Sequence, residues 1–173
     1  MCVFKMRRRE EWESTAQGKA LSNVQVVQIN QVGNAERLQL QAGSKHPLAN
    51  VKVLDLSRVL AGPIAGRTLA AHGGQVLLVT SPNLPCLPGT DVETSLGKRT
   101  TQLDLNVSED IEKLKELLHD TDVFLQAYRP GGLRSRGFGV EDVVKSRENG
   151  VVYASLRAWG WDGPWADRRG VCK

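Results

Sequence analysis

The sequence predicts an α/β fold in which a Rossmann-like parallel sheet is flanked by helices, and three observations support this. Short apolar runs of strand length alternate with amphipathic helical segments from Leu48 onward. The run Val76–Val79 is apolar throughout, as expected for a strand buried on both faces of a parallel sheet. Glycines and prolines mark the helix boundaries. Because strands separated by helices at this spacing need right-handed crossovers, the sheet should be parallel.

The individual elements follow from the same patterns. Strands are expected at 51–56, 76–79, 100–105, 122–126 and 151–156. A helix over 64–72 is opened by Pro63 and ended by Gly73-Gly74, and a short helix is expected at 140–147. Between them, Ser108 should cap a helix whose apolar residues recur every three or four positions: Ile111, Leu114, Leu117 and Leu118. The Pro- and Gly-rich stretch 81–97 is expected to be a loop.

Residues 1–46 differ from the body of the chain at 47–173. They hold one β-like run at 24–29 and then polar sequence, and they predict a leader or remnant with little fixed structure. His46-Pro47 closes this segment, because a residue before proline favours an extended conformation. A chain of 173 residues is long enough for one domain. The body should therefore be that domain.

Composition excludes several function classes. Apolar residues make up 40% of the chain and charged residues 24%, as in a globular protein. The net charge of +4 comes mainly from residues 1–50, which hold seven Lys/Arg against four Asp/Glu, whereas the remainder holds sixteen against fifteen. A nucleic-acid binder should show a dominant basic face, and the body has none. No apolar run reaches the length of a membrane span.

The cysteines and the N-terminal charges bear on metal binding and location. Cys2, Cys86 and Cys172 are far apart, so neither a disulfide framework nor a zinc site is expected. Basic residues near the N-terminus are followed at once by Glu10 and Glu11, which argues against a mitochondrial transit peptide. We therefore expect a cytoplasmic protein without a metal, and a mitochondrial or peroxisomal location stays open.

Arginines follow three of the predicted strands. Arg58, Arg129 and Arg157 stand at or just beyond strand ends, and ligands of open parallel sheets bind at that edge. A guanidinium beside a glycine-rich turn suits phosphate oxygens, and Tyr128 or Trp159 could stack on a purine. The expected ligand is anionic and nucleotide-like. The alternative is purely structural: surface arginines beside turns are common, and the tryptophans could pack a core edge.

An NAD-type dehydrogenase is disfavoured. Gly62 and Gly66 do not make the GxGxxG fingerprint, and the second strand ends in Thr80 where an acidic ribose ligand is wanted.

Four collinear segments over residues 48–170 resemble CoA-transferase family III, the carnitine/bile-acid CoA-transferase family, which includes formyl-CoA transferase and α-methylacyl-CoA racemase. The segments are Val53-Leu54-Asp55-Leu56-Ser57-Arg58-Val59-Leu60-Ala61-Gly62-Pro63, Leu96-Gly97-Lys98-Arg99 with Leu103-Asp104-Leu105, Asp122-Val123 through Tyr128-Arg129-Pro130-Gly131 to Gly137-Phe138, and Tyr153-Ala154-Ser155-Leu156-Arg157-Ala158-Trp159-Gly160 with Gly163-Pro164-Trp165. Each motif is modest by itself, and their order makes the resemblance specific.

The resemblance implies coenzyme A as the ligand and transfer of CoA between an acyl-CoA and a carboxylic acid as the family reaction. By position, Arg58, Leu60 and Ala61 should line the adenine and pantetheine side of the ligand. Lys98 and Arg99 should lie near the phosphates. Tyr128, Arg157 and Trp159 should flank the nucleotide and the thioester arm.

The chain also departs from the family pattern. The Arg usually found two residues before the Gly-Phe pair is Ser135, although Arg134 and Arg136 flank it. The sequence stops at Lys173, before the position of the family's catalytic Asp, which forms an acyl–enzyme anhydride. The small second domain and the return segment that interlock two protomers in relatives have no counterpart either.

From these departures we expect an N-terminal, CoA-binding portion of the large domain with an incomplete fold. It should lack catalytic residues, be inactive alone and be unable to form the interlocked homodimer. A racemase-like member of the family and a non-catalytic CoA-binding module stay open as alternatives. We also expect apolar strand faces such as that of Val76–Val79 to be incompletely covered.

Overall fold

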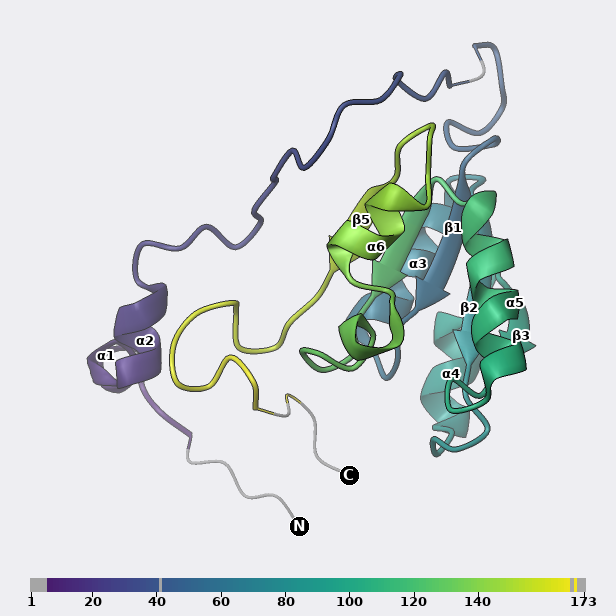
Figure 1. Cartoon of the computed structure of the whole chain (residues 1–173). Coiled ribbons are helices and arrows are strands. Elements are labelled where there is room, and N and C mark those ends of the chain that lie inside the picture. Colours follow the sequence, from purple (N-terminus) through teal and green to yellow (C-terminus); the bar gives the residue numbers. More distant parts are fainter. Residues whose placement is uncertain (1–5, 41, 169, 171–173) are drawn as a thin grey trace. The chain divides into compact units, whose positions relative to one another are not determined.

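The computed structural model describes residues 6–40, 42–168 and 170 (Figure 1). The chain forms two compact units. One, here called the sheet unit, runs from Val32 to Leu156, and the other, the terminal unit, combines Met1–Gln31 with Arg157–Lys173.

The sheet unit is built on five parallel strands in the order β3-β2-β1-β4-β5. The strands are β1 (Lys52–Leu56), β2 (Gln75–Thr80), β3 (Arg99–Gln102), β4 (Val123–Gln126) and β5 (Val152–Ser155). The central strand β1 pairs Leu54 with Leu77 of β2 on one side and with Phe124 of β4 on the other. The predicted α/β fold with a parallel sheet is confirmed, and each predicted strand is present with its ends within three residues of the prediction.

Helices cover both faces of this sheet (Figure 1). The helical elements of the sheet unit are α3 (Ala61–Ala71), α4 (Pro88–Thr94), α5 (Ser108–His119), the 3-10 turn η1 (Arg134–Arg136) and α6 (Val140–Lys145). Leu114 of α5 and Val143 of α6 are fully buried in one core cluster, around Phe124. Leu69 of α3 packs on the other cluster, with Val53 and Val76 among its members. The two clusters are the two sides of a doubly covered sheet.

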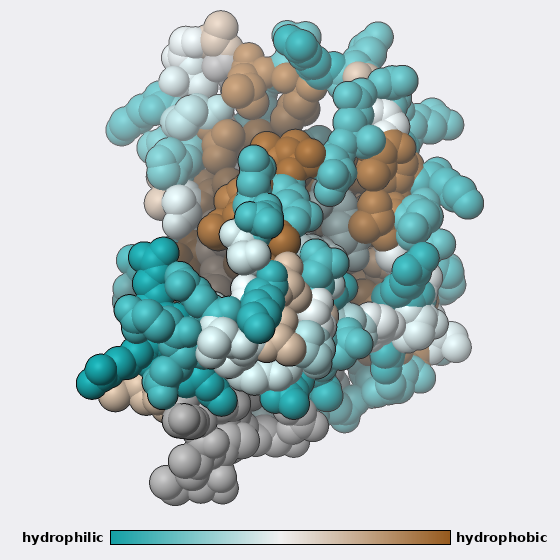
Figure 2. Space-filling view, turned by 90° about the vertical axis from the view of Figure 1, so that its left-hand side faces the viewer, coloured by the Kyte–Doolittle hydropathy of each residue, from teal (hydrophilic) through white to brown (hydrophobic). Residues whose placement is uncertain are grey.

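The expectation that Val76–Val79 would be incompletely covered is wrong. Val76 is 1% exposed, Leu78 7% and Val79 3%, and Leu77 packs against the core. The reason is that α3 and α5 cover the two faces of β2 within the sheet unit itself. Other large apolar side chains are exposed, and on the face shown in Figure 2 the apolar surface lies in patches between polar side chains.

Two local predictions about helices are also wrong. Helix α4 lies within the stretch predicted as a loop, with a proline in its first turn and the Asp91 carboxylate accepting a hydrogen bond from the Leu87 N–H at 2.6 Å. Ser108 is the first residue of α5 rather than its cap, and Val107 occupies the N-cap position without a side-chain hydrogen bond. The Asp110 carboxylate instead accepts a bond from the Asp104 N–H at 2.9 Å, which fixes the start of α5 from within the helix.

The terminal unit contains helices in the segment predicted as a leader. These are α1 (Arg9–Ser14) and α2 (Ala16–Leu21), while the β-like run at 24–29 forms no strand and its side chains Val26 and Ile29 are exposed. Gln17 of α2 is fully buried. Its amide donates to the carbonyls of Trp159 and Asp162, both at 2.8 Å, and accepts from the Trp165 N–H at 2.8 Å. The side-chain amide of Gln17 thus binds three backbone groups in the segment after β5.

Tryptophan rings pack around this amide. Trp12 of α1 stacks on Trp159 with ring centres 6.5 Å apart and meets Trp165 edge-on at 5.6 Å. Trp159 and Trp165 are themselves edge to face at 5.1 Å. The tryptophans therefore pack a small aromatic core, which is the structural alternative that the sequence left open.

In the described part of the chain, no helix is long and apolar enough to cross a membrane. Cys86 is exposed and free, and Cys2 and Cys172 lie outside the described residues.

Candidate functional site

The carboxyl ends of β1 and β4 form the switch point of the sheet. From β1 the chain crosses to β2 on one side, whereas β4 leads to β5 on the other side. Crevices at such points are where open α/β sheets bind ligands. The register pairs Leu56 with Gln126, and the Ala127 N–H donates to the Leu56 carbonyl at 3.4 Å. The turns after the two strands therefore lie side by side.

Tyr128 stands at this point and lines a pocket of about 160 Å³. The other lining residues come from the ends of β1, β2 and β3 and from the turn after β4: Leu56, Val79, Thr80, Ser81, Leu103, Asp104, Leu105, Asn106, Gly132, Leu133 and Arg136. Burial raises the pKa of the Tyr128 phenol above its ordinary value, and the positive charges of Arg58 and Arg136 partly oppose that rise. The phenol is therefore protonated at neutral pH and can act as a hydrogen-bond donor.

Arg58 lies at the end of β1, half-buried, and its charge acts on the Tyr128 phenol. Its guanidinium donates from Nη2 to the Pro85 carbonyl at 2.5 Å, which holds the side chain against the loop after β2. A guanidinium has five N–H donors, so one such bond leaves capacity for an anionic ligand. The predicted neighbours Leu60 and Ala61 are exposed on the same turn.

The turn from β1 into α3 has an unusual backbone. Val59 has a φ of 74°, in the left-handed region that a β-branched residue rarely adopts. A Cβ on Gly62 would lie 2.3 Å from the Ser57 Cβ and 3.1 Å from the Ala127 Cβ. Only a glycine therefore lets α3 start this close to the ends of β1 and β4. Strain of this kind persists where the surrounding structure determines the backbone, and it concentrates at functional sites.

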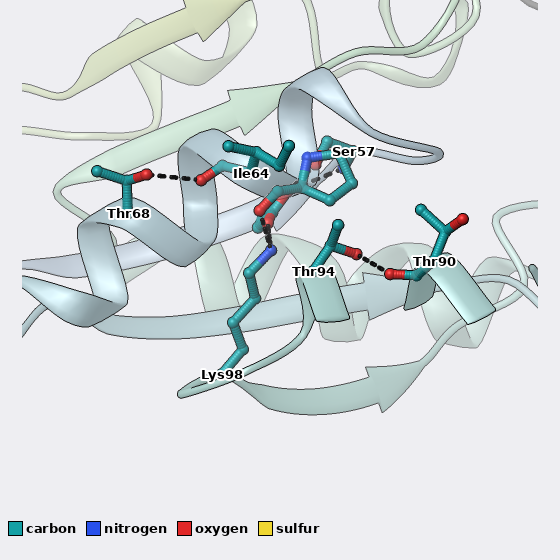
Figure 3. Close-up of polar contacts among 8 residues, drawn as sticks. Ser57, Ile64, Thr68, Thr90, Thr94 and Lys98 are labelled. Carbon is teal, nitrogen blue, oxygen red and sulfur yellow. Dashed lines mark hydrogen bonds and ion pairs between the residues drawn. The ribbon is translucent and has the colours of Figure 1, made fainter. Parts of the chain in front are cut away.

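Lys98 is turned inward (Figure 3). Its ammonium donates to the Asp55 carboxylate at 2.8 Å and to the Pro63 carbonyl at 2.8 Å. Both charged side chains are fully buried. A Cβ on Gly66 would lie 2.2 Å from the Asp55 Oδ2 atom and 2.9 Å from the Lys98 Nζ atom, so this glycine makes room for the pair. The predicted contact of Lys98 with a phosphate stays a prediction.

Three further residues were predicted from the sequence: Arg99, Arg157 and Trp159. Arg99 begins the edge strand β3 and is exposed, level with Leu77 of β2 and thus short of the carboxyl ends. Arg157 and Trp159 belong to the terminal unit. There the Arg157 guanidinium lies over the Trp161 ring, 3.9 Å from its centre. Within the sheet unit, the structure brings together Arg58, Leu60, Ala61 and Tyr128, with Lys98 behind their turn.

Arg136 belongs to the site, although the sequence offered it only as a possible substitute at the Ser135 position. Its guanidinium donates to the Leu105 carbonyl at 3.1 Å, the Gly132 carbonyl at 2.8 Å and the Asn106 side chain at 3.0 Å. It thus clamps two loops that line the pocket, whereas Arg134 is exposed beside Glu141. Asp55 and Ser57 were not predicted as site residues, and the signal available for Asp55 was a charge inside an apolar strand.

Among the residues that the structure describes, no group of three or more His, Cys, Asp or Glu side chains could hold a metal ion.

Known proteins with similar sequences share this region. Residues 48–171 match CoA-transferase family III. An acetyl-coenzyme A transferase of Hypoxylon pulicicidum is 40% identical over 129 residues, which cover 73% of this chain and 22% of that protein. An acyl-CoA transferase of Gibberella moniliformis is 38% identical over 169 residues, covering 93% and 30%. The human succinyl-CoA:glutarate CoA-transferase is 32% identical over 146 residues, covering 78% and 33%.

Solved structures that are similar to this chain give the same result as the sequence comparisons. The crystal structure of Rv3272 from Mycobacterium tuberculosis superposes with a TM-score of 0.66 at 30% identity, covering 73% of this chain and 38% of that one. A CaiB/BaiF family protein from Brucella suis gives a TM-score of 0.62 at 29% identity, covering 73% and 37%. The chain thus spans between about a fifth and two fifths of the length of these relatives. With the matched residues running from β1 through the segment after β5, the chain belongs to CoA-transferase family III.

Proposed function

We propose that this chain is a CoA-binding part of a family III CoA-transferase, and that the whole protein moves CoA between an acyl-CoA and a carboxylic acid. The observation that carries the proposal is that Arg58 and Tyr128 each follow one of the two neighbouring strands β1 and β4 at the switch point of the sheet. Both belong to segments that resemble the family, and the chain matches that family over residues 48–171.

The chemistry of this edge suits a nucleotide-like anion. Arg58 offers a charged fork of hydrogen-bond donors, and the first turn of α3 begins with N–H groups that have no partner within the helix. Tyr128 offers a ring and a protonated phenol beside them. We propose that Arg58, Leu60, Ala61 and Tyr128 contact CoA directly. Contacts of Arg99, Arg157 and Trp159 with CoA are proposed from the resemblance alone. Lys98 contributes to the site from the interior of the sheet unit, where its ammonium binds Asp55 and the Pro63 carbonyl. No residue of the chain is assigned a catalytic role.

Calorimetric titration of the chain with CoA at low and high salt tests the binding step. We expect binding that weakens as salt rises, because the contacts involve phosphate charges. Arg58→Ala should weaken it by about 1–3 kcal/mol through loss of hydrogen bonds to a charged group. The matched control is Arg67→Ala, since Arg67 pairs with Glu93 on the outer side of α3. Absence of CoA binding by the unmodified chain at low salt contradicts the proposal.

The assignment of no catalytic residue has its own test. The purified chain should transfer no CoA from an acyl-CoA donor to a carboxylic acid, and measurable turnover would show that its residues include the nucleophile.

For the whole protein we propose a homodimer, as the resemblance implies, and this is checked by its mass in solution. We also propose a cytoplasmic location for the protein. Recovery of the protein in an organelle fraction would contradict that location.

A further inference from the structure

The turn that carries Arg58 is held at both ends by one buried charge pair. At its start, the Asp55 Oδ1 atom accepts hydrogen bonds from the Ser57 N–H at 3.0 Å and from the Ser57 hydroxyl. At its end, Lys98 binds the Pro63 carbonyl in the first turn of α3 at 2.8 Å. The ion pair between Asp55 and Lys98 joins the two ends. Residues 58–62 therefore lie within a closed loop of hydrogen bonds.

This loop of bonds accounts for the strained backbone inside it. A left-handed Val59 relaxes unless its neighbours hold it, and here both flanks of Val59 are fixed to buried charges. Asp55 and Lys98 are each fully buried, so a bound anion has no path to the Lys98 ammonium without breaking the pair. A buried charge that loses its partner is costly, and this opposes such a break.

We propose that Asp55 and Lys98 are positioning residues: their ion pair fixes the turn at 57–63 so that Arg58 faces the ligand, and Lys98 does not itself bind a phosphate. Ser57 links the pair to Arg58. The part of this inference that concerns CoA rests on the proposed function, whereas the part that concerns the turn stands on the contacts alone.

Labelling with acetic anhydride distinguishes positioning from direct contact. On the full chain, Lys98 should stay unlabelled with and without CoA, because its side chain is fully buried. Lys113, whose side chain is 59% exposed, is the control that should react in both conditions. If Lys98 reacts in the free chain and CoA protects it, then it is a phosphate ligand and the proposal is overturned.

Substitution tests the same inference through the turn. Lys98→Met should speed hydrogen exchange in residues 57–64 and weaken CoA binding about tenfold or more, the size seen when partners behind metal-binding side chains are removed. Lys52→Met is the matched control, since Lys52 forms an exposed ion pair with Asp120 at the other end of β1. It should change neither readout.

Ser57→Ala keeps the test decisive if Lys98→Met does not fold. It removes one buried hydroxyl that donates to Asp55 and leaves the ion pair, so we expect a lower melting temperature with the fold retained, faster exchange in the turn and CoA binding weaker by about fivefold. If hydrogen exchange in the turn and CoA affinity in this variant equal those of the wild type, the proposal is overturned. If the unmodified chain binds no CoA, the proposed function fails, while labelling and exchange still decide whether the pair fixes the turn.

Discussion

The sheet unit and the terminal unit are stabilised in different ways. The sheet unit buries aliphatic side chains and Phe124 on two sides of five parallel strands. Among its described residues, the terminal unit has two helices of six residues each, and the buried residues there are Gln17 and Gly18. Short helices are marginal without tertiary contacts, so here the tryptophan rings and the Gln17 hydrogen bonds stabilise the fold. The contrast indicates that a unit without a sheet depends on a few specific contacts.

The two units can be followed separately by spectroscopy. All four tryptophans, Trp12, Trp159, Trp161 and Trp165, lie in the terminal unit, and both tyrosines, Tyr128 and Tyr153, lie in the sheet unit. Tryptophan fluorescence therefore reports on the terminal unit, and tyrosine signals and strand circular dichroism report on the sheet unit.

The largest effect is expected from Phe124→Ala in the sheet unit. Phe124 is fully buried and stacks on Tyr153, with ring centres 5.2 Å apart. Its truncation should lower the free energy of unfolding by about 3–5 kcal/mol, measured by denaturant titration with circular dichroism. Val152→Ala, on the edge strand and 62% exposed, is the control with little expected change. Equal losses in the two variants would mean that the core cluster does not dominate stability.

A smaller effect is expected from Gln17→Ala in the terminal unit. The substitution leaves the Trp159 and Asp162 carbonyls and the Trp165 N–H without this partner, at a cost of about 1–3 kcal/mol. The transition seen by tryptophan fluorescence should move to lower denaturant, with the strand signal less affected. Lys19→Ala, exposed on the same helix, is the control. If the fluorescence transition stays at the same denaturant concentration as in the wild type, Gln17 is not the contact that stabilises the terminal unit.

A smaller effect still is expected from Arg157→Ala on stability. The guanidinium lies over the Trp161 ring, and such contacts at exposed sites contribute about 0.5–1 kcal/mol. The fluorescence of the terminal unit should change, because the environment of Trp161 changes. If Arg157 also binds CoA, the same variant weakens CoA binding, whereas Trp161→Phe weakens only the local packing. Unchanged CoA affinity in Arg157→Ala would assign this arginine to the terminal unit alone.

The smallest effect concerns the pH dependence of the sheet unit. Because burial raises the pKa of Tyr128 in the folded chain, the unfolded chain ionises first as pH rises. The contribution of this group to stability is therefore constant below the ordinary tyrosine pKa and falls as pH rises through and above it. Absorbance of tyrosinate should show one tyrosine titrating late, and Tyr128→Phe should remove that step. A late step that persists in Tyr128→Phe would assign it to Tyr153.

The sequence alone determined the order of the elements, the parallel sheet and the family. Strand and helix patterns are local, so Val76–Val79 and the apolar face of α5 could be recognised without contacts. Helix α4 was missed because its proline and glycine are typical of loops as well as of a helix start. Helices α1 and α2 were missed because their short polar stretches are stabilised by tryptophans about 145 residues away along the chain.

Only the tertiary structure decided which charges face a ligand and which face the interior. Strand ends predicted that Arg58 and Tyr128 would lie at the same edge of the sheet, because parallel strands bring their carboxyl ends to one edge. Lys98 carries the same charge as Arg58 and stands in an equally specific motif, yet its ammonium is buried beside Asp55. Sequence records the charge of a side chain, whereas its direction depends on a partner that is 43 residues distant in the chain and becomes a neighbour only through the fold.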